Sequence, residues 1–381
     1  MKVRGKFGAL AQAFLLAVSV TALSAGMAHA QQAGDLDALG QSILDNPQDV
    51  DLNFRYAAAA EAAGKPRLAL VAYERILIND PSNETARRGY ERVRRLIEPS
   101  YTVTRLEVGA RFDTNAENLN EDFFFTEGDS TTYFGRLMIA DEREALGTRW
   151  RTIVNAVIED NDTVEVLDYA FIGAQIGPLL YLGPHLAAIP SIGAGASMLD
   201  GDAYFNDVNF GVTLEGRAAG MSYWLRARHG YRDYQTDLST FTFVVEDGAY
   251  TELQAGLTKP QLIFERDTLV VQPFVRWSDM DGDSFGYAPG KFEEYGAEIA
   301  YNFQAGDHIE FSVGALVRER EFDGFERTDS YLSPQASVTL QRVLPCDCDV
   351  RLQYRTREND SSDDLFDYDA EQVTLSLTTR F

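Results

Sequence analysis

The stretch "EYGAEIAYNFQ", Glu294 to Gln304, alternates between apolar or aromatic side chains and polar or small ones. A period of two places the two classes on opposite faces of a β-strand. The same texture runs from Tyr101 to Phe381, where Trp, Tyr, Phe, Val and Thr increase. A soluble sandwich would also alternate, with its apolar face turned inward. We predict fourteen strands, at 101–112, 131–141, 147–159, 164–177, 184–199, 203–218, 219–234, 248–259, 267–278, 291–304, 307–321, 328–342, 348–358 and 367–381.

The lengths of the connections favour a membrane barrel over a sandwich. Outer-membrane barrels have long outer loops on one rim and short turns on the other. We therefore predict a mainly β fold, a fourteen-stranded antiparallel transmembrane β-barrel preceded by a short α-helical domain. The odd-numbered connections are long and acidic, as in DTNAENLNEDFFFTEGDS (113–130), DGDAYFND (200–207) and ENDSSDDLFDYD (358–369), whereas even-numbered ones such as EREALG (142–147), GPLLYLGP (177–184) and RAAG (217–220) are mostly shorter.

Aromatic residues at the strand ends are a second feature of this kind. Rings of Trp and Tyr favour the level of the lipid headgroups, so that they form girdles around a membrane protein. The terminal Phe381 ends an alternating strand and resembles the sorting signal that is read by the barrel assembly machinery. The predicted girdle residues are Tyr101, Trp150, Tyr169, Tyr181, Tyr231, Trp277, Tyr301, Phe303 and Phe381.

Nine arginines on the polar face of the strands are the third feature. An arginine at mid-bilayer on a lipid-facing surface costs roughly 2–4 kcal/mol, so we place these residues in a wet lumen. There they form either a network of ion pairs that only stiffens the barrel or a pathway for an anionic or polar cargo. The expected acidic partners are Glu298, Glu310 and Glu371. The lumen-lining candidates are Arg149, Arg151, Arg226, Arg228, Arg276, Arg318, Arg320, Arg351 and Arg355.

The first thirty residues are typical of a secretory signal peptide. A basic start is followed by an apolar run, and Ala28-His29-Ala30 is a small-x-small cleavage site. A membrane anchor is the alternative interpretation. Removing the signal removes three of the 34 Lys and Arg, and the remaining 31 against 59 Asp and Glu leave a net charge near −28. Such an acidic chain is not expected to bind nucleic acid.

Residues 31–100 have helical rather than strand spacing. Pro47 and Pro81 both end an Asn/Asp-Pro turn, and 81 − 47 gives 34 residues, which is the period of a tetratricopeptide repeat. In that frame Ala69 fills the small-residue position, Tyr73 the aromatic position and Pro81 the terminal proline. We predict a periplasmic helical domain that docks a partner, or alternatively a plain helical hairpin that plugs or props the barrel.

Chemical motifs are few. Cys346 and Cys348 are a possible disulfide in a turn, because an exported chain meets an oxidising compartment. The chain has no Gly-x-Ser-x-Gly motif, no metal-spaced His pair and no phosphate-binding loop, so we expect no enzyme activity, no cofactor and no metal site. Acidic runs such as Asp360 to Asp364 are interpreted as solvated loops, with weak calcium binding as a minor alternative.

The segment RLEVGARFDTNAEN, Arg105 to Asn118, resembles the first barrel strand of the surface lipoprotein assembly modifier (Slam) family, with Asp113-Thr114-Asn115 at the start of its loop. The signal peptide, helical prefix and barrel also resemble that family's plan. The resemblance implies export or surface display of proteins or lipoproteins across the outer membrane of a Gram-negative bacterium. Polysaccharide exporters share the plan, and a general diffusion porin is a third possibility. The expected partners are outer-membrane lipids and lipopolysaccharide, the barrel assembly machinery and a periplasmic protein or lipoprotein cargo.

Overall fold

The computed structural model describes residues 29–81, 83–97, 100–120, 128–183, 186–235, 245–282, 290–323 and 327–381. The chain divides into two compact units, Met1–Pro99 and Ser100–Phe381. The predicted signal peptide lies outside the described residues, apart from His29 and Ala30 at the start of the first helix.

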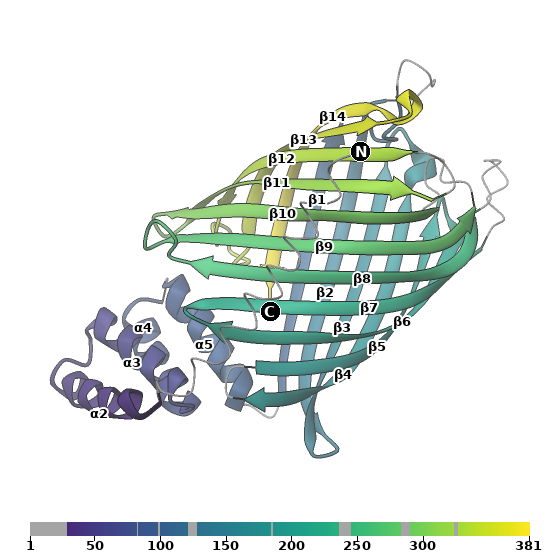
Figure 1. Ribbon diagram of the computed structural model, residues 1–381. Helices are drawn as coiled ribbons and strands as arrows, with labels where there is room; N and C mark the ends of the chain where they lie inside the picture. The colour runs from purple at the N-terminus through teal and green to yellow at the C-terminus, as the bar shows by residue number, and fades with distance from the viewer. Residues whose placement is uncertain are drawn as a thin grey trace, which may run out of the picture. The chain divides into compact units, whose positions relative to one another are not determined.

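The second unit is a closed barrel of fourteen antiparallel strands (Figure 1), which confirms the predicted fold class. Each strand pairs with its neighbours in the sequence, and β1 pairs with β14 to close the ring. At one end of this closing pair, the Phe381 N–H donates to Thr104 O at 2.9 Å, and the Thr104 N–H donates to Phe381 O at 3.1 Å. The strands are β1 (Ser100–Asp113), β2 (Ser130–Ala145), β3 (Thr148–Asn161), β4 (Tyr169–Gly183), β5 (Leu186–Leu199), β6 (Asp202–Ala218), β7 (Met221–Tyr234), β8 (Val245–Pro260), β9 (Asp267–Gly282), β10 (Lys291–Ala305), β11 (Ile309–Phe322), β12 (Thr328–Leu340), β13 (Asp349–Ser361) and β14 (Tyr368–Arg380).

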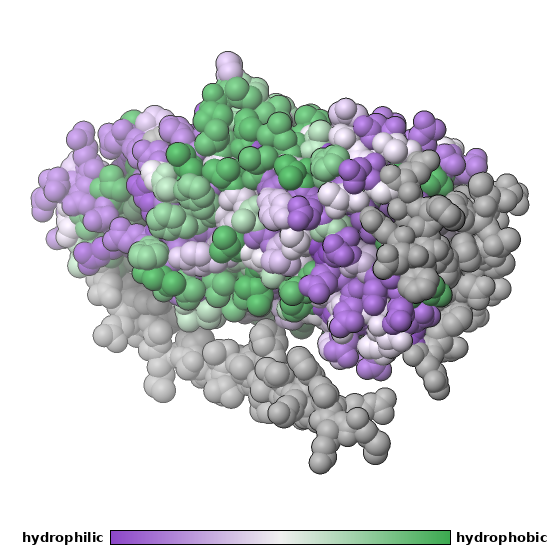
Figure 2. Space-filling model, turned by 90° about the horizontal axis from the view of Figure 1, so that it is seen from above, coloured by the Kyte–Doolittle hydropathy of each residue, from purple (hydrophilic) through white to green (hydrophobic). Residues whose placement is uncertain are grey.

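The apolar face of the strands is turned outward. Leu106 on β1 pairs with Leu137 and Thr379, and the odd residues of β14 continue the same face. Hydrophobic atoms gather in the middle of the view in Figure 2, and hydrophilic atoms gather toward both sides. A soluble protein rarely exposes so many large apolar side chains, whereas a barrel in lipid requires them. Among the exposed residues of this face are Val108, Tyr133, Ile158, Ile172, Ile192, Val208, Phe210, Leu253, Ile299, Phe311, Val313, Leu352, Val373 and Leu375.

Two predicted connections are wrong. The fifth is not a long loop but the two-residue turn Asp200-Gly201, whose φ values of 51° and 77° suit a tight hairpin, and the acidic residues that follow belong to β6. The fourth connection is not the predicted segment 177–184, because β4 begins later than predicted and continues through Pro178 to Gly183. Pro178 pairs with Trp150 of β3, and the ladder to β5 is interrupted near Pro178 and Pro190, since proline lacks the donor that a ladder needs.

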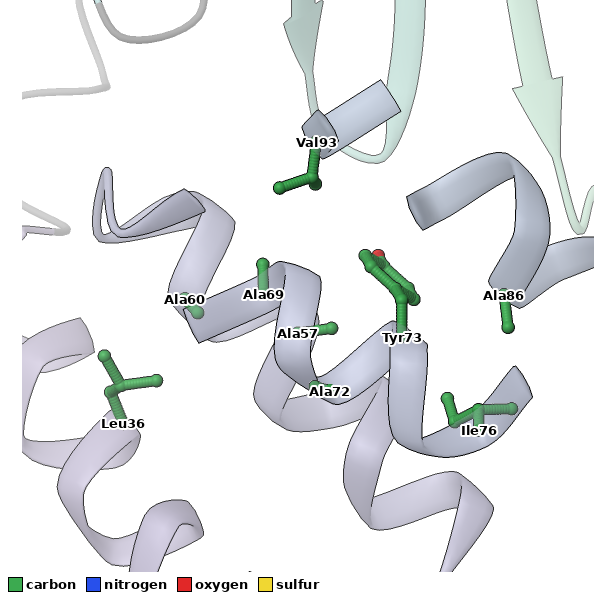
Figure 3. Packing of buried hydrophobic residues seen from close by; sticks show 9 residues of the cluster. All are labelled: Leu36, Ala57, Ala60, Ala69, Ala72, Tyr73, Ile76, Ala86 and Val93. Atoms are coloured by element: carbon green, nitrogen blue, oxygen red, sulfur yellow. The ribbon is translucent and has the colours of Figure 1, made fainter. Parts of the chain in front are cut away.

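The first unit contains four helices in its described part: α2 (His29–Asp45), α3 (Val50–Ala62), α4 (Pro66–Asn79) and α5 (Glu84–Ile97). Asp49 caps α3 by accepting the Leu52 N–H at 2.9 Å, and Pro66 starts α4 where an N–H is not needed. Figure 3 shows the small and branched side chains of the helical core, which are Leu36, Ala57, Ala60, Ala69, Ala72, Tyr73, Ile76, Ala86 and Val93. No described helix is long and apolar enough to cross a membrane.

Candidate functional site

The interior of the barrel is identified by ion pairs between strands that are not neighbours. Arg151 on β3 reaches Glu215 on β6, with Nη1 and Oε1 2.5 Å apart, and Arg111 on β1 reaches Glu159 on β3 at 3.0 Å. Such contacts are possible only through the lumen. Because strand side chains alternate, the register then places every one of the nine predicted arginines on the inner face.

Six of the nine arginines form ion pairs. At one end of the lumen, Glu142 on β2 bonds Arg151 at 2.8 Å and lies 3.5 Å from Arg149. Three of the others, Arg228, Arg276 and Arg320, belong to a row that crosses β7 to β12 in register, where cations and carboxylates alternate. The fourth, Arg318, contacts this row from one inner-face position away. The distances along the row are 2.5 Å for Arg228–Glu252, 3.4 Å for Arg276–Glu252, 3.0 Å for Arg276–Glu294 and 2.6 Å for Arg320–Glu294, and the row continues to Asp329 opposite Arg320. We call this row the charge ladder.

Glu294 is the centre of the charge ladder. Its side chain is 0% exposed, and it also accepts from Arg318 at 3.4 Å. A carboxylate is buried at reasonable cost only where several charge-assisted hydrogen bonds replace its water. Three guanidinium groups do so here, while they keep 23 to 36% of their own side-chain surface exposed. The ladder therefore presents fixed positive charge to water inside the barrel.

Aromatic rings hold the arginines in place by a recurring three-layer contact. Phe134 lies over Gly109 of the paired strand, where an added Cβ would be 2.6 Å from the ring, and the Arg136 guanidinium is 4.6 Å from the other side. The order glycine, ring, arginine recurs twice more, each time with the ring and the arginine two residues apart on one strand. The other two stacks are Gly256, Trp224 and Arg226, and Gly296, Phe274 and Arg276.

The last three predicted arginines have no carboxylate within 4.0 Å among the described residues. Arg226 is bounded in register by Thr213 and Gln254. Arg355 lies between Gln335 and Gln372, and its Nη2 donates to Gln335 Oε1 at 2.7 Å. Arg351 lies between Thr339 and Ser376. All three thus have neutral cross-strand neighbours.

The wall made by β4, β5 and β6 differs from the ladder. The inner face of its middle part carries small or neutral side chains. In a closed ring of fourteen strands, β11 is seven strands from β4, so Arg318 and Arg320 lie on a strand opposite this wall, whereas Arg228 on β7 lies beside it, next to Gly211 in register. The wall residues include Gly173, Gln175, Ser191, Gly193, Gly195, Gly211 and Thr213.

The acidic partners were predicted poorly. Glu371 lies on the outer face, because it alternates with Gln372 and shares the parity of Val373. Glu298 and Glu310 face inward, where they accept hydrogen bonds from Gln335 at 3.3 Å and from Gln341 at 3.4 Å. Strand pairing, which one sequence does not state, decides which carboxylate meets which arginine. The residues that the sequence reasoning missed are Arg111, Arg136, Arg232, Arg357, Asp113, Glu142, Glu159, Asp207, Glu252 and Glu294.

The predicted aromatic girdle is only partly on the outer face. Trp150, Tyr231, Trp277, Tyr301 and Phe303 point outward. Phe381 is 76% exposed, and its role as an assembly signal stays a prediction. Register places the remaining three, Tyr101, Tyr169 and Tyr181, on the inner face, because an aromatic at a strand end does not by itself reveal its side of the sheet.

The other predicted positions lie at turns and in the helical unit. Cys346 and Cys348 are joined by a disulfide in the connection from β12 to β13. Ala69 and Tyr73 are buried on α4, and Pro81 follows that helix. Among the described residues, no group of three or more His, Cys, Asp or Glu is placed to hold a metal ion.

A polar triad lies at the edge of the helical core. The Tyr73 hydroxyl donates to Glu61 Oε1 at 2.7 Å, and Arg92 Nη2 donates to the same oxygen at 2.6 Å and to the hydroxyl at 3.1 Å. Burial, followed by the charge of Glu61, raises the pKa of Tyr73 above its ordinary value of 10.0. The triad fixes α3, α4 and α5 to one another.

No protein-family model matches the chain, and no curated protein matches it significantly in sequence. Among solved structures, a BenF-like porin from Pseudomonas fluorescens Pf-5 is 7% identical, with 74% of this chain and 99% of the porin covered and a TM-score of 0.37. OpdL of Pseudomonas aeruginosa is 9% identical, with coverage of 74% and 98% and a TM-score of 0.39. A bacterial polysaccharide outer membrane secretin is 10% identical, with coverage of 73% and 98% and a TM-score of 0.42. These likenesses concern barrel architecture and carry nothing about cargo.

Proposed function

We propose that the chain is a transport barrel of a Gram-negative outer membrane and that its lumen passes anionic solutes. The apolar outer face supports the location, because only lipid makes such a surface favourable. The observation that carries the cargo class is the charge ladder, whose arginines remain 23 to 36% exposed while the chain as a whole has a charge of −25. Arginines that remain exposed in a narrow pore attract anions and repel cations.

The test is conductance of the purified full chain in planar lipid bilayers under a potassium chloride gradient. We expect single-channel steps and a reversal potential that indicates chloride preference. A zero current contradicts the transport role, and cation preference contradicts the anionic cargo. Raising the salt from about 0.1 to 1 M shortens the Debye length from about 10 to 3 Å and should weaken the preference.

Export of a protein or lipoprotein is the second candidate, and the helical unit favours it. The pair α3 and α4 buries Ala69 and Tyr73 at the positions expected for a tetratricopeptide-like repeat, and such repeats stack into peptide-binding faces. Periplasmic orientation of this unit is part of the same proposal. Polysaccharide export and unselective diffusion remain the alternatives from the sequence, and the bilayer current separates diffusion from the selective pathway.

Deleting residues 31–97 tests the export candidate. Surface display of a lipoprotein encoded beside this gene should be lost, while the conductance of the barrel should remain. Display at the full level without the helices contradicts a docking role. Glycosyltransferase genes in place of a lipoprotein gene would favour polysaccharide export.

A further inference from the structure

The lumen holds two kinds of arginine, and they differ in what an anion must displace. Arg276, Arg318 and Arg320 already share Glu294. A solute carboxylate near them competes with a protein carboxylate that is fixed by the fold. Where an arginine has neutral cross-strand neighbours and no ion pair among the described residues, an incoming carboxylate can form a charge-assisted pair without displacing a bonded protein carboxylate.

Arg226 is an arginine of this second kind. Within the described residues it has no ion pair, and its cross-strand neighbours Thr213 and Gln254 are neutral. Its guanidinium is 5.2 Å from the centre of the Trp224 ring, and that ring lies over Gly256. Stacking on a ring orients a guanidinium but leaves the N–H groups at its edge for a ligand. Arg226 is therefore positioned without a direct ion pair, although Glu215 and Glu252 act on its charge from a distance.

Arg355 has the same character on a different strand. It donates a hydrogen bond to Gln335 at 2.7 Å, and its neighbours in register are the amides Gln335 and Gln372. Gln335 is in turn held by Gln353 and by a 3.3 Å contact to Glu298. An amide oxygen orients the guanidinium and carries no net charge. The second arginine is again fixed without a direct ion pair among the described residues.

The topology places these two arginines across the lumen from each other. Arg226 lies near the middle of β7 and Arg355 near the middle of β13, and the two strands are six apart in one direction around the ring and eight in the other. Arg228, one inner-face position along from Arg226, is paired with Glu252, and Arg357, one along from Arg355, is paired with Asp113. Two of the three predicted arginines that have no ion pair within the described residues thus lie at mid-strand on opposite walls, whereas the third, Arg351, lies near the start of β13.

We propose that Arg226 and Arg355 form the anion-selecting pair of the lumen and bind the carboxylate of a permeating solute at mid-barrel. This proposal rests on the proposed transport of anions. In this proposal the charge ladder mainly stabilises the barrel wall, and the two arginines with neutral cross-strand neighbours select the solute. The guanidinium fork matches a carboxylate with two parallel hydrogen bonds, so small organic carboxylates are the expected ligand class.

The experiment compares two charge-matched double variants of the full chain in planar bilayers. Arg226→Gln with Arg355→Gln should lower the chloride-to-potassium permeability ratio by about threefold or more. Arg217→Gln with Arg380→Gln removes the same two charges from exposed inner-face positions at the ends of β6 and β14, where water screens them. This control should change the ratio far less. Equal shifts in the two variants overturn the proposal, because selectivity would then follow total charge.

A second measurement uses succinate as the probe carboxylate. Added on one side, it should reduce the chloride current of the unaltered chain, and the half-blocking concentration should rise about tenfold in the Arg226→Gln, Arg355→Gln variant. Arg226→Lys with Arg355→Lys keeps the charge but loses the fork, so it should keep the chloride preference and lose most of the succinate block. An unchanged block in both variants overturns the proposal. If the unaltered chain carries no current, both the proposed function and this inference are overturned. If it carries a current that succinate does not block, or if the two double variants shift the permeability ratio equally, this inference alone is overturned.

Discussion

Ile76 in the helical unit is 1% exposed, whereas Leu375 in the barrel is 54% exposed and Glu294 beside the lumen is 0% exposed. The helices bury a core of apolar residues, with the polar triad of Tyr73, Glu61 and Arg92 at its edge, although some apolar residues such as Leu44 and Ile78 remain exposed. The barrel buries carboxylates among arginines and turns its apolar residues outward. Each unit thus matches a different surrounding medium: water around the helices and lipid around the strands, with water inside the ring.

The largest expected effect comes from breaking the centre of the barrel's polar interior. Glu294→Gln leaves Arg276, Arg318 and Arg320 without their shared carboxylate. Removing one side of a buried ion pair typically costs about 3–5 kcal/mol. Urea unfolding in lipid vesicles, followed by tryptophan fluorescence, measures the loss.

The control is Glu298→Gln, which changes the same chemical group four residues along the same face. Glu298 is partly exposed and is contacted by Gln335, so the free energy of unfolding should fall by less than about 1 kcal/mol. Equal losses in the two variants would contradict the central place of Glu294.

The next effect tests which medium touches each face of one strand. Leu375→Arg puts a cation on the outer face of β14 and should cost roughly 2–4 kcal/mol, while Thr374→Arg, one residue away on the inner face, should cost less than about 1 kcal/mol. Both are measured by the same vesicle unfolding experiment. A larger loss of stability in Thr374→Arg than in Leu375→Arg would contradict the assignment of lipid to the outer face and water to the inner face.

A smaller effect is expected from added bulk on a small apolar residue. Ala69 is 0% exposed in the helical core, so Ala69→Leu overpacks it and should cost about 1–3 kcal/mol. Ala297→Leu adds the same atoms to the outer face of β10, where lipid chains yield, and should stay within about 0.5 kcal/mol. Amide hydrogen exchange reports on α3 to α5 and vesicle unfolding on the barrel. A tolerated Ala69→Leu would show that the helical core is not close-packed.

The smallest effect concerns the polar edge of the helical unit. Tyr73→Phe removes a hydroxyl that bonds Glu61 and Arg92 and should cost about 1 kcal/mol. Because folding raises the pKa of Tyr73 above 10.0, the fold favours the neutral hydroxyl. That stability is fully present below pH 10 and is lost as the pH rises further. Hydrogen exchange of α4 from pH 9 to 11 should show this loss in the unaltered chain and not in Tyr73→Phe; parallel pH profiles would contradict it.

The sequence was sufficient for the strand number and for the face of each arginine. Alternation is a property of single strands, so the parity that puts Leu375 outside also puts Gln372 and Arg380 inside without knowledge of any partner. The same parity places Glu371 on the outer face, so alternation alone already argues against it as a partner of the lumen arginines.

Pairing was beyond the sequence because it is a relation between strands. Glu294 meets Arg276 and Arg320 only through the registers of β9 and β11, which depend on turn lengths and on the closure of the whole ring. The fifth connection illustrates this. Asp200-Gly201 has the residue pattern of a tight turn, but the acidic residues that follow it predict a loop. Because β6 pairs with β5 from Asp202 onward, those acidic residues belong to the strand and the connection is the two-residue turn. Tyr169 and Tyr181 were misplaced because girdle residues at strand ends have few neighbours to set their parity.

The stacks of glycine, ring and arginine have a consequence for the history of the gene. Each of the three glycines lies on a different strand from the ring that covers it. A methyl group at Gly109, Gly256 or Gly296 would collide with that ring. A change of glycine would tilt the ring and swing the cation behind it away from its place in the pore. At positions 109 and 296 the added group would also collide with a backbone oxygen, of Leu375 and Val317, whereas at position 256 its nearest atoms all belong to the Trp224 ring. Positions 109 and 296 should therefore remain glycine when related sequences diverge and position 256 should substitute together with position 224, so that residues without side chains carry a heritable record of where the charge in the channel must be.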